Sequence, residues 1–282
     1  MKKIYQHLYN TTGKEIITIG RSNKWKRKVL FTLLFLTYEL SVLDKVLAMQ
    51  LSQRPESFQN ADVTSLQQPH LDLLDALSWW RTKAQATANQ GKQYNGCLFG
   101  DSISSGIGNT LGEHTFNFGK GGLSSVSLVE QLKLLSSANV KCYNAIIAVG
   151  TNDAWHKISD KLFIKNMRQA ISWVRAMGAT HVTLIPAFYS TIAASHDPTK
   201  AGSIQRVESI NALIHQVAAT EDVPIESQGL KFLFKNQSLK ENLTFDGVHL
   251  NENGKKIYRQ FLLKILEART RPLANRKKAI SH

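Results

Sequence analysis

A chain of 282 residues can bury one substantial core, with about 50 to 90 residues left over for a leader or an accessory segment. Its net charge of +14 is concentrated at the ends, because residues 1–28 carry eight Lys or Arg against Glu15 and residues 264–282 carry six against Glu267. A folded nucleic-acid binder is expected to hold its basic surface on the domain itself, so this distribution argues against a nucleic-acid partner.

The N-terminal segment has the residue order of a secretory signal. A basic run at 24–28 precedes an apolar stretch at 29–43, and residues 46–48 resemble a small-residue cleavage site. The stretch is short for a membrane-spanning helix and contains Glu39, so an anchor is the second interpretation and a buried helix the third. We interpret residues 1–48 as a basic leader plus a hydrophobic segment. The first two interpretations place the rest of the chain outside the cytoplasm, and the third leaves it cytoplasmic.

A polar stretch rich in Gln, Ser, Pro and Asn follows, and we expect a linker at 49–68. Residues 69–93 are expected to form an accessory helix that ends before Gly91. Apolar residues recur at helical spacing and predict its packed face: Leu73, Leu74, Leu77, Trp80 and Ala84. Trp79 and Trp80 are both expected to pack against the domain, and a binding role is the lesser interpretation.

The remainder alternates apolar runs with amphipathic helical patterns. Five runs predict strands, at 94–100, 113–119, 144–150, 181–186 and 223–227, and three patterns predict helices, at 160–177, 204–220 and 252–268. Such alternation predicts an α/β domain at 94–268 with a mostly parallel sheet and helices on both faces, followed by a basic tail at 269–282. Cys97 and Cys142 each begin an apolar run, and their thiols are expected to pack as small hydrophobic groups without a disulfide framework.

Chemically useful residues fall where the predicted strands end. The stretch FGDSISSG at 99–106 places Ser102 after the first strand, and DGVHLN at 246–251 supplies Asp246 and His249. A serine hydroxyl becomes a nucleophile when a base takes its proton and an acid group orients that base. His249 and Asp246 are the candidates for those two roles.

Acyl transfer also needs donors for a developing oxyanion. NFGKGG at 117–122 offers the backbone N–H of Gly122, GTND at 150–153 offers the side-chain amide of Asn152, and the backbone N–H of Ser102 is a third candidate. Each piece alone has an ordinary structural explanation as a turn, a helix cap or a packed histidine. Together, and in this order, the motifs are a specific signal for acyl transfer by a serine nucleophile.

GDSIS, NFGKGG, GTND and DGVHLN together resemble the motifs of the SGNH/GDSL hydrolase family of esterases and lipases, over about residues 94–266. The resemblance implies a flavodoxin-like three-layer α/β/α sandwich with a mostly parallel five-stranded sheet. It also implies that Ser102 is the nucleophile, that His249 is the general base and acid, and that Asp246 orients His249. Ser102, Gly122 and Asn152 would form the oxyanion hole, and neither a metal nor a cofactor is implied.

Other site chemistries fit less well. A lipase-type G-x-S-x-G turn would need glycine where Ser104 stands, and the GKGG sequence at 119–122 lacks the upstream glycine of a phosphate-binding loop.

We expect a serine esterase that cleaves a carboxylic ester through an acyl-enzyme on Ser102. The substrate would be a small molecule, a lipid or an acylated glycan. One alternative is an envelope polysaccharide O-acetylesterase or O-acyltransferase that uses the same residues. The non-enzyme alternative is a membrane-tethered binding protein. If residues 29–43 form an anchor, we expect membrane association through them. Four aromatic residues are candidates for the substrate pocket: Trp155, His156, Phe188 and Tyr189.

Overall fold

The computed structural model describes residues 76–269, so the leader at 1–48, the linker at 49–68 and nearly all of the basic tail lie outside the described residues. The elements in chain order are α2 (Ala76–Ala88), β1 (Gln93–Gly100), α3 (Ser102–Ser105), β2 (Thr115–Asn117), α4 (Ser125–Ser137), β3 (Lys141–Ala148), α5 (Thr151–Trp155), α6 (Asp160–Ala176), β4 (His181–Leu184), α7 (Ile192–Ser195), α8 (Ile204–Glu221), η3 (Gln228–Phe232), β5 (Phe234–Lys235), β6 (Ser238–Leu239), η4 (Glu241–Leu243) and α9 (Glu252–Arg269).

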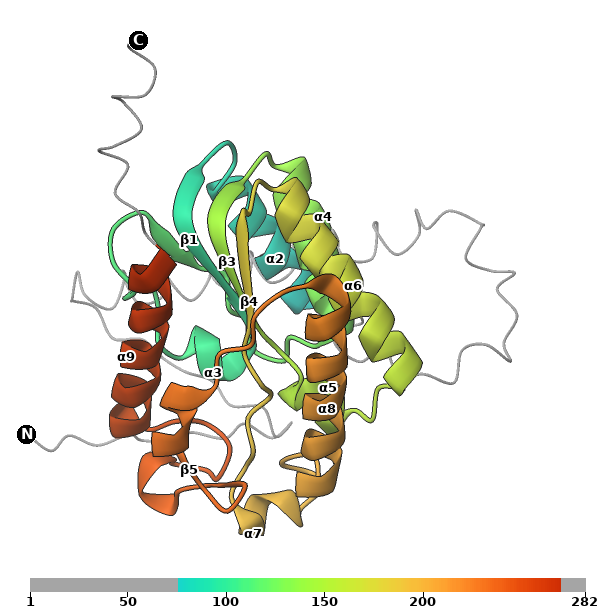
Figure 1. The fold of residues 1–282 in the computed structure, drawn as a ribbon, viewed down its shortest axis with the longest axis vertical. Coiled ribbons are helices and arrows are strands. Elements are labelled where there is room, and N and C mark those ends of the chain that lie inside the picture. The colour runs from blue at the N-terminus through green and yellow to red at the C-terminus, as the bar shows by residue number, and fades with distance from the viewer. Residues whose placement is uncertain (1–75, 270–282) are drawn as a thin grey trace, which may run out of the picture. The chain divides into compact units, whose positions relative to one another are not determined.

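The core of the fold is a parallel sheet in the order β2-β1-β3-β4. Successive side chains of a strand point to opposite faces, so Phe99 and Ile147 belong to one buried cluster while Leu98 and Ile146 belong to the other. Helices α2, α4, α6 and α8 cover the first face, and α9 covers the second (Figure 1). This arrangement confirms the predicted α/β sandwich.

The sheet has four strands in place of the expected five. Residues 223–227 reach the edge at a single parallel bridge between Leu184 and Ile225. The carbonyl of Pro224 accepts from the backbone N–H of Leu184, and the backbone N–H of Glu226 donates to the Leu184 carbonyl. Pro224 itself has no N–H to donate, which explains why the ladder stops there.

The three amphipathic helices form almost where they were predicted, as α6, α8 and α9. In α6 the buried apolar residues are those of the predicted face: Phe163, Met167, Ala170, Ile171 and Val174. The helix ends before Gly178, whose φ of 99° is a left-handed conformation that favours glycine.

Helix α2 packs through the face opposite to the predicted one. Trp79, Trp80 and Ala84 are exposed, whereas Thr82 and Ala86 of the helix and Asn89 just after it are buried. Polar contacts select this face, since Gln131 of α4 donates a hydrogen bond to Gln85 and Tyr94 of β1 donates one to Asn89. Helical spacing alone could not have revealed those partners. The side chains of Leu73, Leu74 and Leu77 lie outside the described residues.

The two cysteines also differ from expectation, because Cys97 of β1 and Cys142 of β3 form a disulfide with their Cα atoms 6.0 Å apart. Both residues are buried in the same cluster. Two cysteines on predicted strands gave no sign that those strands would be neighbours, and only the pairing of β1 with β3 brings them together. Among the helices at 76–269, none combines the length and apolar character that crossing a membrane requires.

Candidate active site

Ser102 lies immediately beyond the carboxyl end of β1, as the first residue of the short helix α3. Asp101 caps this helix, and its carboxylate accepts a 3.0 Å hydrogen bond from the backbone N–H of Ile103. Ser104 faces inward and shares a 2.9 Å hydrogen bond with the buried hydroxyl of Tyr258 on α9. These contacts fix the turn that presents Ser102 at the edge of the sheet.

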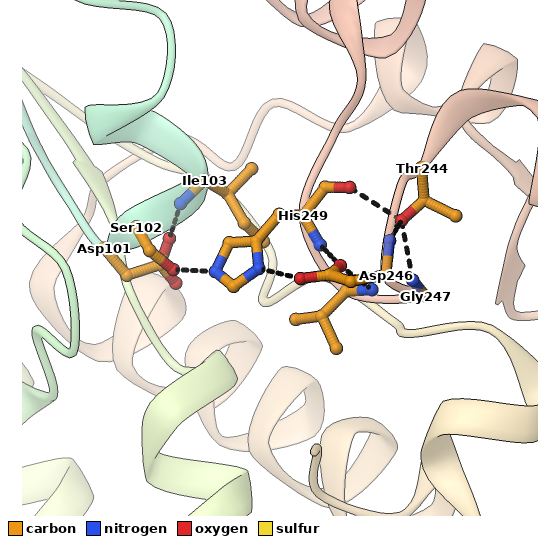
Figure 2. A network of polar contacts seen from close by, with 8 residues as sticks. Asp101, Ser102, Ile103, Thr244, Asp246, Gly247 and His249 are labelled. Atoms are coloured by element: carbon orange, nitrogen blue, oxygen red, sulfur yellow. Dashed lines mark hydrogen bonds and ion pairs between the residues drawn. The ribbon is translucent and has the colours of Figure 1, made fainter. Parts of the chain in front are cut away.

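His249 and Asp246 come from the loop before α9 and meet Ser102 across this edge (Figure 2). Nε2 of His249 lies 2.9 Å from Oγ of Ser102, and Nδ1 of His249 lies 2.6 Å from Oδ2 of Asp246. The side chains of His249 and Asp246 are 39% and 38% exposed. The three residues therefore form a continuous hydrogen-bonded chain that is open to solvent.

The Asp246 carboxylate is held in its charged form. Burial acts to raise its pKa, but hydrogen bonds from the His249 ring and from the backbone N–H groups of His249 and Val248 outweigh burial, so the pKa lies below its ordinary value. The two backbone bonds to Oδ1 measure 2.7 and 2.9 Å. An ionised Asp246 accepts the Nδ1–H of His249 and leaves Nε2 to accept a proton from Ser102.

Thr244, which the sequence analysis did not identify, ties this loop together. Its hydroxyl donates to the carbonyl of His249 at 2.6 Å and accepts from the backbone N–H of Gly247 at 2.9 Å (Figure 2). Threonine at a turn often bonds local backbone groups in this way. Its place two residues before Asp246 is the one signal that could have indicated the role.

Asp101 is the most strongly perturbed acid near the site. It is 3% exposed, and burial raises its pKa to about 6, against the opposing effects of hydrogen bonds from Ile103 N–H and the Thr151 hydroxyl and of the nearby His249. Asp101 is therefore a buried acid that precedes Ser102 in the sequence and interacts electrostatically with His249.

The glycine loop at 117–122 packs directly on α3. The backbone N–H of Lys120 donates to the carbonyl of Gly100, and the Asn117 side chain donates to the carbonyl of Ser104. A Cβ atom on Gly119 would lie 2.7 Å from the backbone nitrogen of Ser105, so this close approach requires glycine. Gly122 has a φ of 72° and open space around it, so here the backbone conformation favours glycine.

Asn152 is bound to the end of the same loop. It is buried, and its Nδ2 donates to the carbonyl of Leu123 at 3.1 Å. A carboxamide has two N–H donors, so this bond uses one of them. Because Leu123 follows Gly122 in the sequence, this bond brings the predicted donors at Gly122 and Asn152 close together in the fold.

Asp153, the residue after Asn152, stabilises this region, and its role was not predicted from the sequence. It is fully buried, and its carboxylate accepts from the hydroxyl of Ser125 at 2.5 Å and from its backbone N–H at 3.0 Å. Asn166 of α6 donates to the same hydroxyl. The start of α4 is thereby fixed to the turn that carries Asn152.

The four expected pocket residues lie in different surroundings. Phe188 is 4% exposed and packs against Phe234 and Tyr258 in the core. Tyr189 is half-buried against Phe234. Trp155 is exposed, its indole N–H donates to the carbonyl of Pro198, and its ring stacks on His156. An aromatic ring that the sequence analysis did not single out, Phe245, is exposed and stacks on His249.

Within residues 76–269, no group of three or more His, Cys, Asp or Glu side chains is arranged to hold a metal ion. The Ser102, His249 and Asp246 chain can move a proton from a hydroxyl to an imidazole. The predicted hydrogen-bond donors for an oxyanion, at Gly122 and Asn152, lie on other segments of the domain.

Comparisons with other proteins agree with this geometry. Residues 98–257 match the sequence model of the GDSL-like Lipase/Acylhydrolase family. A GDSL-like lipase from Bacteroides thetaiotaomicron has 18% identity and a TM-score of 0.54, with 68% of this chain and 98% of that chain covered. A lipase/acylhydrolase from Enterococcus faecalis has 19% identity and a TM-score of 0.50, with 64% and 98% covered. At such identities these likenesses establish the fold. The chain matches no curated protein in sequence.

Proposed function

Because the chain belongs to the GDSL-like lipase/acylhydrolase family and is a hydrolase of the SGNH type, we propose that it cleaves a carboxylic ester by serine catalysis, with Ser102 as the nucleophile. The observation that carries the proposal is the hydrogen-bonded chain from Ser102 through His249 to Asp246, with distances of 2.9 and 2.6 Å. Such a chain is the arrangement that a serine hydroxyl needs to react near neutral pH.

In the first half of the reaction, Oγ of Ser102 attacks the ester carbonyl carbon while Nε2 of His249 takes the hydroxyl proton. Asp246 stabilises the imidazolium that forms. The same proton then passes from His249 to the departing alkoxide, which leaves as the alcohol. The acyl group remains on Ser102 as an ester.

The tetrahedral intermediate carries a negative oxygen that needs donors. We assign this role to the backbone N–H groups of Ser102 and Gly122 and to the Nδ2 of Asn152. The support is that Asn152 is buried with one of its donors already fixed on Leu123, while the glycine loop packs on α3. Donors held in place before the reaction need no reorganisation as charge develops, and each is worth a few kcal/mol.

In the second half, His249 takes a proton from water as the water attacks the acyl-enzyme. The resulting tetrahedral intermediate collapses, the proton returns to Oγ of Ser102, and the carboxylic acid is released. The partial exposure of His249 and Asp246 supports this step because water can reach the imidazole.

We further propose that the domain works outside the cytoplasm, either exported or membrane-anchored. The Cys97–Cys142 disulfide supports this location, since disulfides persist in oxidising compartments and are rare in a reducing cytosol. That location favours an O-acylated envelope glycan as a second candidate substrate. Either water or a sugar hydroxyl would then accept the acyl group from Ser102.

The test is covalent labelling of the full-length chain with a p-nitrophenyl phosphonate, followed by mass spectrometry of the tryptic peptides. We expect the label on the peptide that contains Ser102, release of p-nitrophenol from p-nitrophenyl acetate, and loss of both in Ser102→Ala. Full ester turnover by Ser102→Ala would refute the proposed nucleophile. Absence of both label and turnover in the wild-type chain would favour the membrane-tethered binding protein.

A further inference from the structure

The outward face of α2 is unusual because it carries two tryptophans. Trp79 and Trp80 are 42% and 43% exposed, and their rings meet edge to face at a centroid distance of 5.5 Å. The helix is held on the domain by its other face, through Thr82, Ala86 and Asn89. The two largest apolar side chains described on α2 are therefore exposed on the surface of the domain.

One cation, the Lys83 ammonium, lies over both rings. Nζ of Lys83 lies 5.2 Å from the Trp79 ring centroid and 5.3 Å from that of Trp80. Arg81, which follows Trp80 in the sequence, is exposed. Helix α2 contains no acidic residue over Ala76–Ala88. Tryptophan beside Lys and Arg is the composition found where proteins meet the headgroup region of a membrane, because the indole is amphipathic and the cations attract anionic lipid.

The chain that leads into α2 supplies the second argument. Its sequence contains the basic run at 24–28 and the apolar stretch at 29–43, and only 32 residues, 44–75, separate that stretch from α2. A polypeptide spans at most about 3.5 Å per residue, so α2 stays within about 110 Å of the apolar stretch while that stretch remains attached. Any membrane that holds the stretch is then always within reach of α2.

We propose that the face of α2 formed by Trp79, Trp80 and Lys83 docks on an anionic phospholipid surface. The two indoles enter the headgroup region, and the Lys83 ammonium contacts a lipid phosphate. This contact is separate from ester cleavage and does not depend on the proposed function. It involves the described domain itself, and so it is distinct from any attachment through residues 29–43.

Docking through α2 would also orient the candidate active site. On the packed face of the helix, Thr82 accepts a 3.2 Å hydrogen bond from Nζ of Lys120, which lies in the glycine loop. The other end of the helix leads toward the start of β1, because Asn89 bonds Tyr94. The tryptophans therefore lie toward the end of α2 that is nearer to the glycine loop, and the site would be presented close to the lipid surface.

The test uses the full-length chain with vesicles of phosphatidylcholine and phosphatidylglycerol whose acyl chains are brominated, since bromine quenches tryptophan emission at short range. The comparison is between wild type and Trp79→Phe/Trp80→Phe. Because Trp25 adjoins the apolar stretch at 29–43 in the sequence and adds a third fluorophore, we expect the double variant to lose roughly half or more of the quenchable emission. The matched control is Trp173→Phe on α6, which is expected to lose none.

A second variant tests the chemistry of the contact. Trp79→Ser/Trp80→Ser should abolish the slowed hydrogen exchange that we expect for the backbone of α2 on these vesicles, while hydrolysis of p-nitrophenyl acetate, or phosphonate labelling, stays at the wild-type level. Equal quenching in wild type and Trp79→Phe/Trp80→Phe would overturn the proposal. So would a wild-type dimer in sedimentation velocity that becomes a monomer in the serine variant, because the face would then bind a second copy of the chain.

Discussion

Nε2 of His249 lies 2.9 Å from Oγ of Ser102, although 147 positions separate the two residues in the chain. Ser102 is positioned by the end of β1, whereas His249 is positioned by a loop whose own hydrogen bonds define its shape. The distance between the two atoms therefore depends on how firmly that loop is held. The hydroxyl of Thr244 and the carboxylate of Asp246 make most of its internal bonds.

Thr244→Val removes the hydroxyl but keeps the shape of the side chain. We expect kcat/KM for p-nitrophenyl acetate to fall by about tenfold, because the carbonyl of His249 and the N–H of Gly247 lose their shared partner and the imidazole is less well placed. The rate of phosphonate labelling at Ser102 should fall by a similar factor. Thr244→Ser keeps the hydroxyl and should restore most of both rates, and a serine variant as slow as the valine variant would contradict the proposed role.

Asp101 should make the free energy of unfolding decrease as pH rises, which is opposite to the usual effect of an aspartate. Burial raises its pKa to about 6, whereas an aspartate in an unfolded chain has a pKa near 3.9. The native state then binds the proton more tightly, so the contribution to stability is fully present below about pH 4 and is lost as pH rises to about 6. The difference of about two pKa units corresponds to about 3 kcal/mol.

Asp101→Asn removes this titration and keeps an oxygen that can accept from the N–H of Ile103. We expect the free energy of unfolding of the variant, relative to wild type, to increase by about 3 kcal/mol between about pH 4 and about pH 7. Urea denaturation at the two pH values measures this difference. An identical difference at both pH values would show that Asp101 does not titrate in this range.

The Cys97–Cys142 disulfide should contribute substantially to stability because it closes a loop with a sequence separation of 45. Loop-closure entropy for such a length predicts about 4 kcal/mol. We expect dithiothreitol to lower the urea midpoint of the wild-type chain and to leave that of Cys97→Ala/Cys142→Ala unchanged. An equal shift in both proteins, or none in the wild type, would mean that the two thiols are not paired in solution.

Much of the fold follows from local patterns in the sequence. Apolar periodicity predicted α6, α8 and α9, because their inward faces are apolar and pack on the sheet. The Ser102, Asp246 and His249 set was proposed from motif chemistry, and the structure places the three within hydrogen-bond distance. These features could be predicted because short segments define them.

The features that were missed depend on partners distant in sequence. The packed face of α2 is chosen by Gln131 and Tyr94, and the disulfide depends on the pairing of β1 with β3. Phe188 follows a strand just as a pocket residue would, yet it points into the core against Tyr258 of α9. Neither propensity nor spacing contains that information, because tertiary contacts decide which face of a segment is buried.

Gly119 and Gly121 lie in the same loop but differ in the space around them. A Cβ atom on Gly119 would lie 2.7 Å from the backbone nitrogen of Ser105 and 3.1 Å from the carbonyl carbon of Ser104, and neither backbone atom can move without displacing α3. Gly121 has no atom within 4 Å of the same position and no left-handed φ. We therefore expect Gly119→Ala to lower kcat/KM by about a hundredfold, since the proposed oxyanion donors and Ser102 would be pushed apart, and Gly121→Ala to leave it within about twofold of wild type. Circular dichroism should show both variants folded, so that the loss reflects the site, and equal activity of the two variants would refute the close packing of the glycine loop on α3.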